Sequence, residues 1–188
     1  MQLEKLFKTK WVHKYMNLAK SLAETNDACY SRKIGCVLVS KNNRVISTGY
    51  NGALQGISHC DSDEWIDYIK KSRPKYKQHN FCKKECPRRS LNIPSGKELD
   101  ICALCSHAER NALYSCARYG IETNDSVMYC WCGIPCIDCT RAIISCGVVG
   151  VVCLESEYPD YSPDSRQVFK MANVKVLEVS TGVLLNND

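Results

Sequence analysis

Two short groups of metal-binding side chains constrain this chain more than any other feature. They are His107-Ala108-Glu109 and Pro135-Cys136-Ile137-Asp138-Cys139. Each group opens a segment with helical spacing, and a strand is predicted between them. Cys136 and Cys139 are one helical turn apart, so both sulfur atoms can face one point, and helix N-termini help to keep them as thiolates. A fold that joins the two helix starts gives three protein ligands and one open position, the arrangement of a catalytic zinc.

Glu109 suits a proton shuttle better than a fourth ligand. Zinc lowers the pKa of bound water towards neutrality. A carboxylate beside it can take that proton and pass it to a ring nitrogen and a departing amine. The order H-x-E…P-C-x-x-C is the known signature of zinc nucleobase deaminases, and this chain resembles them in that pattern. The alternative is a purely structural zinc site, for which Cys130 or Cys132 would be the fourth ligand.

The rest of the pattern predicts an α/β fold. Helices are expected at 10–26, 107–119, 136–146 and 164–172, and strands at 36–40, 45–50, 127–131, 148–154 and 174–179. The first two strands are expected to form a hairpin. This order predicts one domain over 1–188, with helices on both faces of a central mixed sheet of about five strands.

Residues 53–104 are polar and irregular, and we interpret them as a cysteine-rich insertion with a short helix near 62–71. A structureless segment of this length is unusual in a compact domain, so something must hold it in place. Between Lys70 and Lys97 ten basic residues accompany a single acidic one, Glu85. This stretch is either a solvated surface or a region that meets phosphates.

The composition excludes several classes. No apolar run approaches the roughly 20 residues that span a bilayer, so we expect no membrane association. The charged N-terminus does not resemble a signal peptide, and we expect a cytoplasmic protein. Fourteen cysteines in such a chain indicate metal ligands and small buried residues rather than disulfides, and Cys36 and Cys153 suit the buried role.

Three further motifs complete a resemblance to a known family: Gly49-Tyr50-Asn51-Gly52, His59-Cys60-Asp61 and Ile93-Pro94-Ser95-Gly96. With the two ligand groups, they resemble the dCMP (deoxycytidylate) deaminase family of the zinc-dependent cytidine deaminase superfamily over roughly residues 10–180. The resemblance implies a three-layer α/β/α cytidine-deaminase-like fold. It also implies a hydrolase that converts dCMP into dUMP and ammonia for thymidylate synthesis, with Glu109 as the catalytic residue.

The resemblance also implies substrate-binding residues. Asn51 would bond the deoxyribose or base, with Ala108 and Tyr158 beside the substrate. The alternatives are a turn role for Asn51, since Asn-Gly is a turn signal, and an ordinary loop position for Tyr158. Phosphate binding needs Arg or Lys, so Arg32 and Lys33 are candidates for it, with a solvated turn as the alternative.

A second, structural zinc is a further implication of the resemblance. Cys29, Cys60 and Cys102 match its ligands, with Cys86 the first choice as fourth ligand and Cys105 or Cys82 as substitutes. Four thiolates would close a tetrahedral site and pin the insertion. The alternative is a set of buried free cysteines.

Partners follow from the resemblance as well. A homo-oligomer is expected, with a hexamer as one form, and dCTP and dTTP are candidate effectors. The rival functions are deamination of dCTP, deamination of cytosine or adenine in a polynucleotide, and a non-catalytic zinc-binding module. Nucleic acid is disfavoured because aromatic residues do not alternate with the basic stretch. The chain departs from the family at Arg110, which replaces a more usual neutral residue, and in the longer run 129–134.

Overall fold

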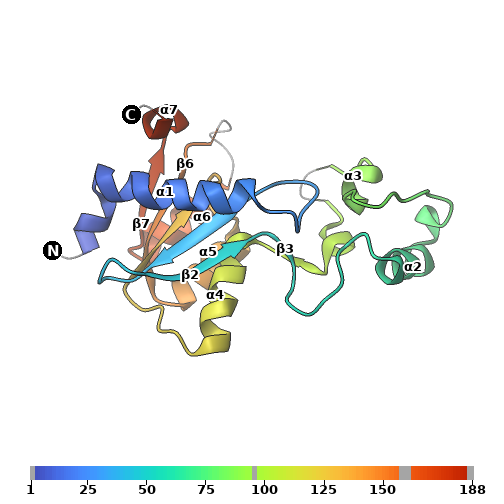
Figure 1. Ribbon diagram of the computed structural model, residues 1–188, viewed down its shortest axis with the longest axis horizontal. Helices are drawn as coiled ribbons and strands as arrows, with labels where there is room; N and C mark the ends of the chain where they lie inside the picture. The colour runs from blue at the N-terminus through green and yellow to red at the C-terminus, as the bar shows by residue number, and fades with distance from the viewer. Residues whose placement is uncertain (1–2, 95–96, 157–161, 186–188) are drawn as a thin grey trace.

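The computed structural model describes residues 3–94, 97–156 and 162–185. Its centre is a five-stranded mixed sheet, as predicted, with strand order β2-β1-β5-β6-β7 (Figure 1). β1 pairs antiparallel with both β2 and β5, and β5, β6 and β7 run parallel. The strands are β1 Gly35–Val39, β2 Val45–Tyr50, β5 Ser126–Cys130, β6 Val148–Leu154 and β7 Lys175–Val179.

Helices cover both faces of this sheet, which confirms the three-layer prediction. α1 (Thr9–Glu24) lies on one face, with η1 (Leu3–Phe7) and α7 (Thr181–Leu185). The other face carries α4 (Ala108–Tyr119), α5 (Ile137–Ser145) and α6 (Pro163–Met171). Neighbouring residues of β5 divide between the two cores: Val127 and Tyr129 pack with α1, whereas Met128 and Cys130 pack with α4 and α5.

The start of α4 depends on a close approach to β2. A Cβ atom at Gly49 would lie 2.2 Å from the carbonyl oxygen of Ala108 and 2.6 Å from the backbone nitrogen of Ala112. Only glycine allows the helix and the strand to come this near. α4 ends at Gly120, whose φ of 64° is the left-handed conformation that closes many helices.

The insertion is ordered and has a small core of its own. It contains α2 (Asp63–Ser72), η2 (Pro74–Tyr76), α3 (Pro87–Ser90) and η3 (Leu99–Cys102). Four isoleucines form its centre: Ile66, Ile69, Ile93 and Ile101. In Figure 1 the insertion, with α2 and α3, extends to the right, away from the main sheet.

Part of the insertion's positive charge is balanced within the insertion. Lys75 pairs with Glu98 at 2.9 Å, and Lys83 pairs with Asp63 at 2.8 Å. Arg73 pairs with Asp100. The basic stretch is therefore partly used for local structure.

The insertion joins the body through a two-stranded sheet. β3 (Gly52–Ala53) directly follows Asn51, and β4 (Cys105–Ser106) directly precedes His107. The two strands pair antiparallel, so both ends of the insertion meet beside the start of α4. Among the described residues, no helix is long and apolar enough to cross a membrane.

Candidate active site

The fold brings His107, Cys136 and Cys139 together at the facing starts of α4 and α5. The Nδ1 atom of His107 lies 3.4 Å from the sulfur of Cys136 and 3.4 Å from the sulfur of Cys139. Across the described ranges, this is the only set of three His, Cys, Asp or Glu side chains whose ligand atoms all lie within 4.8 Å of one another. The structure thus assembles the three residues that the sequence selects as ligands.

Helix caps set the positions of these ligands. His107 is the N-cap of α4 and Cys136 is the N-cap of α5, and both have extended backbone conformations. The helix at 136–146 therefore begins one residue later than predicted, at Ile137. Cys139 lies in the first turn of α5 and is fully buried. Both groups of ligands are held by the rigid ends of helices that pack on the sheet.

The spacing of the donor atoms fits zinc. A tetrahedral zinc with Zn–N of about 2.0 Å and Zn–S of about 2.3 Å separates nitrogen from sulfur by about 3.5 Å. The two observed separations, both 3.4 Å, agree with this value. Neither Cys130 nor Cys132 belongs to the group of described residues that meets this spacing. Three protein ligands leave the fourth position for water or substrate.

The two thiols of the site are electrostatically different. The Cys139 thiol, then the His107 ring and the backbone N–H of Cys139, lower the pKa of Cys136 to about 3. The contact with Cys136, with burial added, raises the pKa of Cys139. The contact with Cys136 is also the main cause that raises the pKa of His107. This contact favours the thiolate at Cys136, and a metal would take the place of the proton on Cys139.

Glu109 lies in the first turn of α4, next to these ligands. Its side chain is 4% exposed and contacts the Cys139 thiol. Burial raises the pKa of its carboxyl group, while its own backbone N–H and His107 act in the opposite direction. A carboxyl group with a raised pKa beside a metal site can both accept and donate a proton.

Asn51 is a structural hub in this structure. Its Oδ1 accepts hydrogen bonds from Asn26 Nδ2 at 2.9 Å and from the Ile34 backbone at 2.8 Å. Its Nδ2 donates to the Arg32 carbonyl at 2.7 Å. The side chain is 8% exposed and ties the loop 26–34 to the end of β2. Sequence reasoning missed Asn26, because nothing in its local sequence links it to Asn51.

Of the other two predicted substrate residues, the structure describes Ala108 but not Tyr158. Ala108 is fully buried and is the first residue of α4. Its backbone N–H is one of the helix N-terminal donors that have no acceptor within the helix. Tyr158 lies outside the described residues, as do Ser95 and Gly96.

Three cysteines of the insertion and Cys105 of β4 form two neighbouring thiol pairs. Cys60 contacts Cys105, and Cys86 contacts Cys102. The contact with Cys105, followed by burial, raises the pKa of Cys60, while the contact with Cys102 lowers the pKa of Cys86 to about 5. The charge of Cys86 also acts on Cys60, so the two pairs are close.

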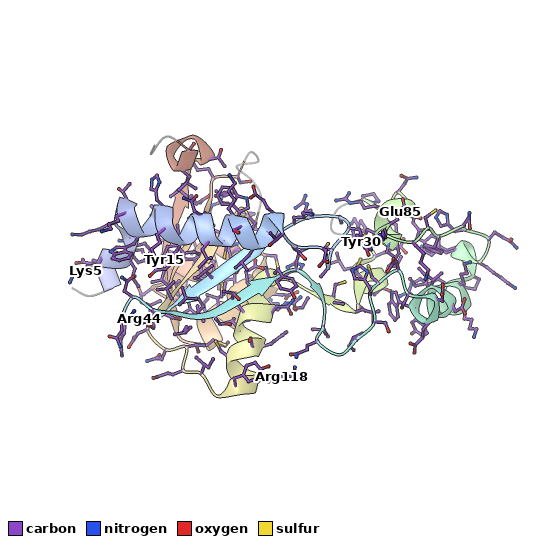
Figure 2. All side chains as sticks on the ribbon, in the orientation of Figure 1. Lys5, Tyr15, Tyr30, Arg44, Glu85 and Arg118 are labelled. Atoms are coloured by element: carbon purple, nitrogen blue, oxygen red, sulfur yellow. The ribbon has the colours of Figure 1, made fainter. Side chains whose placement is uncertain are left out.

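Cys29 lies on the loop after α1 and lines a surface hollow with Tyr30 and Lys84. Figure 2 shows Tyr30 where the body meets the insertion. The Tyr30 ring packs against the His59 ring at a tilt of 47°. The His59 ring nitrogens lie 2.9 Å from Asp61 and 2.8 Å from the Ala28 carbonyl. His59 is thus engaged by protein groups.

Comparisons with known proteins agree with this geometry. Residues 9–155 match the cytidine and deoxycytidylate deaminase zinc-binding region. A deoxycytidylate deaminase of Schizosaccharomyces pombe is 37% identical over 161 residues, 85% of this chain. The chain spans only 40% of that protein's length. The deoxycytidylate deaminase of Enterobacteria phage T2 is 30% identical, with 84% of this chain and 87% of the phage protein covered.

The crystal structure of a dCMP deaminase from cyanophage S-TIM5 in complex with dCMP and dUMP has the same fold. Its TM-score is 0.61 at 22% identity, and the match covers 92% of this chain and 99% of that one. The matched region contains both ligand groups and Glu109, so the chain belongs to the cytidine and deoxycytidylate deaminase family, defined by its zinc-binding region.

Proposed function

We propose that this chain is a zinc-dependent deaminase that converts dCMP into dUMP and ammonia. The observation that carries the proposal is the buried carboxyl group of Glu109 against three donor atoms spaced for zinc. Several relatives named deoxycytidylate deaminase support the choice of dCMP. The basic stretch is weak support for a polynucleotide substrate, because several of its charges are already paired within the insertion.

His107, Cys136 and Cys139 would hold the zinc, which supplies a Lewis acid that activates a water molecule. Glu109 accepts a proton at its carboxylate and returns it to the ring nitrogen and then to the leaving amine. Its raised pKa suits both transfers. The buried position of Glu109 keeps bulk water away from that proton.

The same geometry suggests how the pocket is arranged. The backbone N–H of Ala108, which has no acceptor within α4, would donate to the substrate. Asn51 acts at least through the loop 26–34 that it holds, which contains Arg32 and Lys33. The Asn51 amide has a second N–H besides the one that it donates to the Arg32 carbonyl, so a direct bond to the nucleotide would not have to replace a protein bond. This contact and that of Tyr158 stay predictions.

Ammonia release tests the proposed function. The purified protein is given dCMP, dCTP, deoxycytidine and a cytosine-containing single strand, and zinc per chain is counted on the same sample. Turnover of dCMP supports the proposal. Turnover of only dCTP or only the single strand would keep the zinc mechanism but identify a different substrate. Bound zinc with no turnover, even after dCTP is added as activator, would favour the non-catalytic alternative.

We also propose a second, structural zinc in the insertion. Cys60, Cys86 and Cys102 are its central ligands, and either Cys105 or Cys29 completes the set. The contacts between the two thiol pairs support Cys105, whereas the resemblance supports Cys29. Closing the site requires the pairs to draw together around the ion, which would pin the insertion.

Zinc counting on single variants decides the ligands. Cys102→Ser should lower the zinc content and stability more than the chemistry, and Cys105→Ser and Cys29→Ser identify the fourth ligand. Cys146→Ser is the matched control, because Cys146 is a free cysteine at the end of α5 and belongs to neither proposed ligand set. A normal zinc count in Cys102→Ser would remove that residue from the set.

A cytoplasmic location, a homo-oligomer such as a hexamer, and control by dCTP and dTTP also stay predictions. All fourteen cysteines lie in the described ranges and are free thiols, which fits a reducing compartment.

A further inference from the structure

Asn26 and Asn51 are two buried asparagines whose side chains meet. Asn26 follows the C-cap of α1, Asn51 stands between β2 and β3, and their exposed fractions are 4% and 8%. Asn26 Nδ2 donates to the Asn51 backbone oxygen at 2.8 Å and to Asn51 Oδ1 at 2.9 Å, which uses both of its N–H groups. Asn26 Oδ1 accepts from the Ala28 backbone N–H at 2.9 Å. Reversing the Asn26 amide would break all three bonds, so its orientation is fixed.

The orientation of the Asn51 amide is fixed as a consequence. Its Oδ1 receives two donors, one from Asn26 and one from the Ile34 backbone, and a carbonyl oxygen has two lone pairs. Its Nδ2 donates one N–H to the Arg32 carbonyl. Turning the amide by half a rotation would set N–H against N–H and oxygen against oxygen, and buried polar groups left unpaired are strongly disfavoured.

One polar feature of Asn51 stays available to a ligand. Within the described part of the chain, its second Nδ2–H has no acceptor, whereas both lone pairs of its Oδ1 are in use. The fixed amide can therefore offer one donor and no acceptor.

Contacts on both sides of Asn51 hold it beside the start of α4. The carbonyl oxygen of Tyr50, directly before it, accepts a hydrogen bond from Asn111 Nδ2 of α4 at 2.8 Å. Gly52, directly after it, pairs with Ser106, which precedes the histidine ligand by one residue. Asn51 is thus held next to the helix start where the metal ligand and the proton shuttle lie.

We propose that Asn26 is a positioning residue of the substrate site: it fixes the Asn51 carboxamide so that Asn51 presents a single N–H to the nucleotide and selects an acceptor oxygen there. On dCMP this acceptor is the 3′-hydroxyl oxygen of the deoxyribose or the carbonyl oxygen of the base. A nucleotide with only a donor at that point leaves the N–H without a partner and is disfavoured. The inference rests on the proposed function and deepens it.

Two analogues of dCMP identify the acceptor in the wild-type protein. One lacks the 3′-hydroxyl group, and the other has sulfur, a weaker acceptor, in place of the base carbonyl oxygen. The KM of each is compared with that of dCMP in the ammonia-release assay. One of the two should bind roughly threefold to tenfold more weakly than dCMP, as expected for one neutral hydrogen bond.

Asn26→Ala tests the positioning role. Without the two N–H groups the Asn51 amide can turn, so the KM for dCMP should rise roughly threefold to tenfold while kcat stays nearly unchanged. The difference between dCMP and the weaker analogue should largely disappear. A residue that only supports the fold would weaken both nucleotides by the same factor, so the ratio of the two KM values separates the roles.

Two further variants complete the design. Asn26→Ser keeps one donor and should retain part of the wild-type ratio, and it serves if thermal melts show that Asn26→Ala does not fold. Asn80→Ala makes the same chemical change at an exposed position and should match the wild type.

Two outcomes would overturn the inference. If neither analogue binds the wild-type protein more weakly than dCMP, Asn51 meets no acceptor oxygen. If the wild-type ratio persists in Asn26→Ala, Asn26 does not set the orientation of the amide. A wild-type protein that turns over none of the three nucleotides would refute the proposed function itself, which separates the two proposals.

Discussion

Replacing Glu109 with glutamine tests the central chemical step. The side chain is 4% exposed, and glutamine has nearly the same volume, so the substitution opens no cavity. It removes the group that accepts and returns the proton while His107, Cys136 and Cys139 stay in place. A positioned acid or base contributes about 10²- to 10⁴-fold to a rate, equivalent to about 3 to 5 kcal/mol of activation free energy.

We therefore expect Glu109→Gln to lose about 10²- to 10⁴-fold in kcat for dCMP, with an unchanged zinc content. Folding should not suffer, because burial raises the pKa of Glu109 and so disfavours its charged form. The assay combines ammonia release with a zinc count and a thermal melt. Glu122→Gln makes the same chemical change at an exposed position and should match the wild type.

The result that refutes this reasoning is specific. A Glu109→Gln protein that keeps zinc and turns over dCMP at more than about a tenth of the wild-type rate would exclude a shuttle role, since the smallest expected loss is about 10²-fold. Loss of zinc together with activity would instead make Glu109 part of the metal-binding structure, and its proposed role would again be wrong.

Three more predictions concern a close backbone contact, a set of hydrogen bonds and a carboxylate with a lowered pKa. Gly49→Ala should destabilise the fold by about 1–3 kcal/mol or more in denaturant melts, because its Cβ would lie 2.2 Å from the Ala108 oxygen. Asn51→Ala breaks one buried and two partly buried hydrogen bonds and should cost about 2–4 kcal/mol and raise KM; an unchanged melt would contradict the hub role. The Asp61 carboxylate accepts hydrogen bonds from the Lys84 backbone and His59, which lower its pKa below 3.8 despite partial burial. The stability that a lowered pKa contributes is present above the unfolded pKa and is lost as pH falls through the folded pKa. Exchange of insertion amides should therefore rise below about pH 4. Asp61→Asn should weaken that dependence, and the remainder belongs to Glu98 and Asp100, whose pKa values are also lowered.

The sequence was sufficient for the parts of the fold that have local signals. Periodic apolar residues place α1, α4 and α5 and all five strands of the main sheet within about two residues. The H-x-E and C-x-x-C spacing selects the three ligands that the fold brings within 4.8 Å. These signals succeed because helix geometry fixes which neighbouring side chains share a face.

Other features depend on contacts that no local pattern encodes. The short elements η1 and α7 were not predicted, and they are ordered by packing on α1 and the sheet. The thiol contacts of the insertion join Cys60 to Cys105 and Cys86 to Cys102, pairs whose sequence spacing does not reveal them. Asn51 was assigned to the substrate because the motif draws attention to it, whereas its bond to Asn26 joins residues 25 positions apart.

The placement of β3 and β4 links the insertion to the active site. β4 ends one residue before His107, and Cys105 lies in β4 itself. β3 follows Asn51 and holds β4 through the pairing of Gly52 with Ser106. The β3–β4 pair beside His107 is therefore anchored twice. Asn51 holds it on the side of β3, and the thiol contact of Cys105 holds it on the side of β4. An insertion that loses its thiol cluster releases one of these anchors, so the fold of the insertion is part of what holds His107 in place.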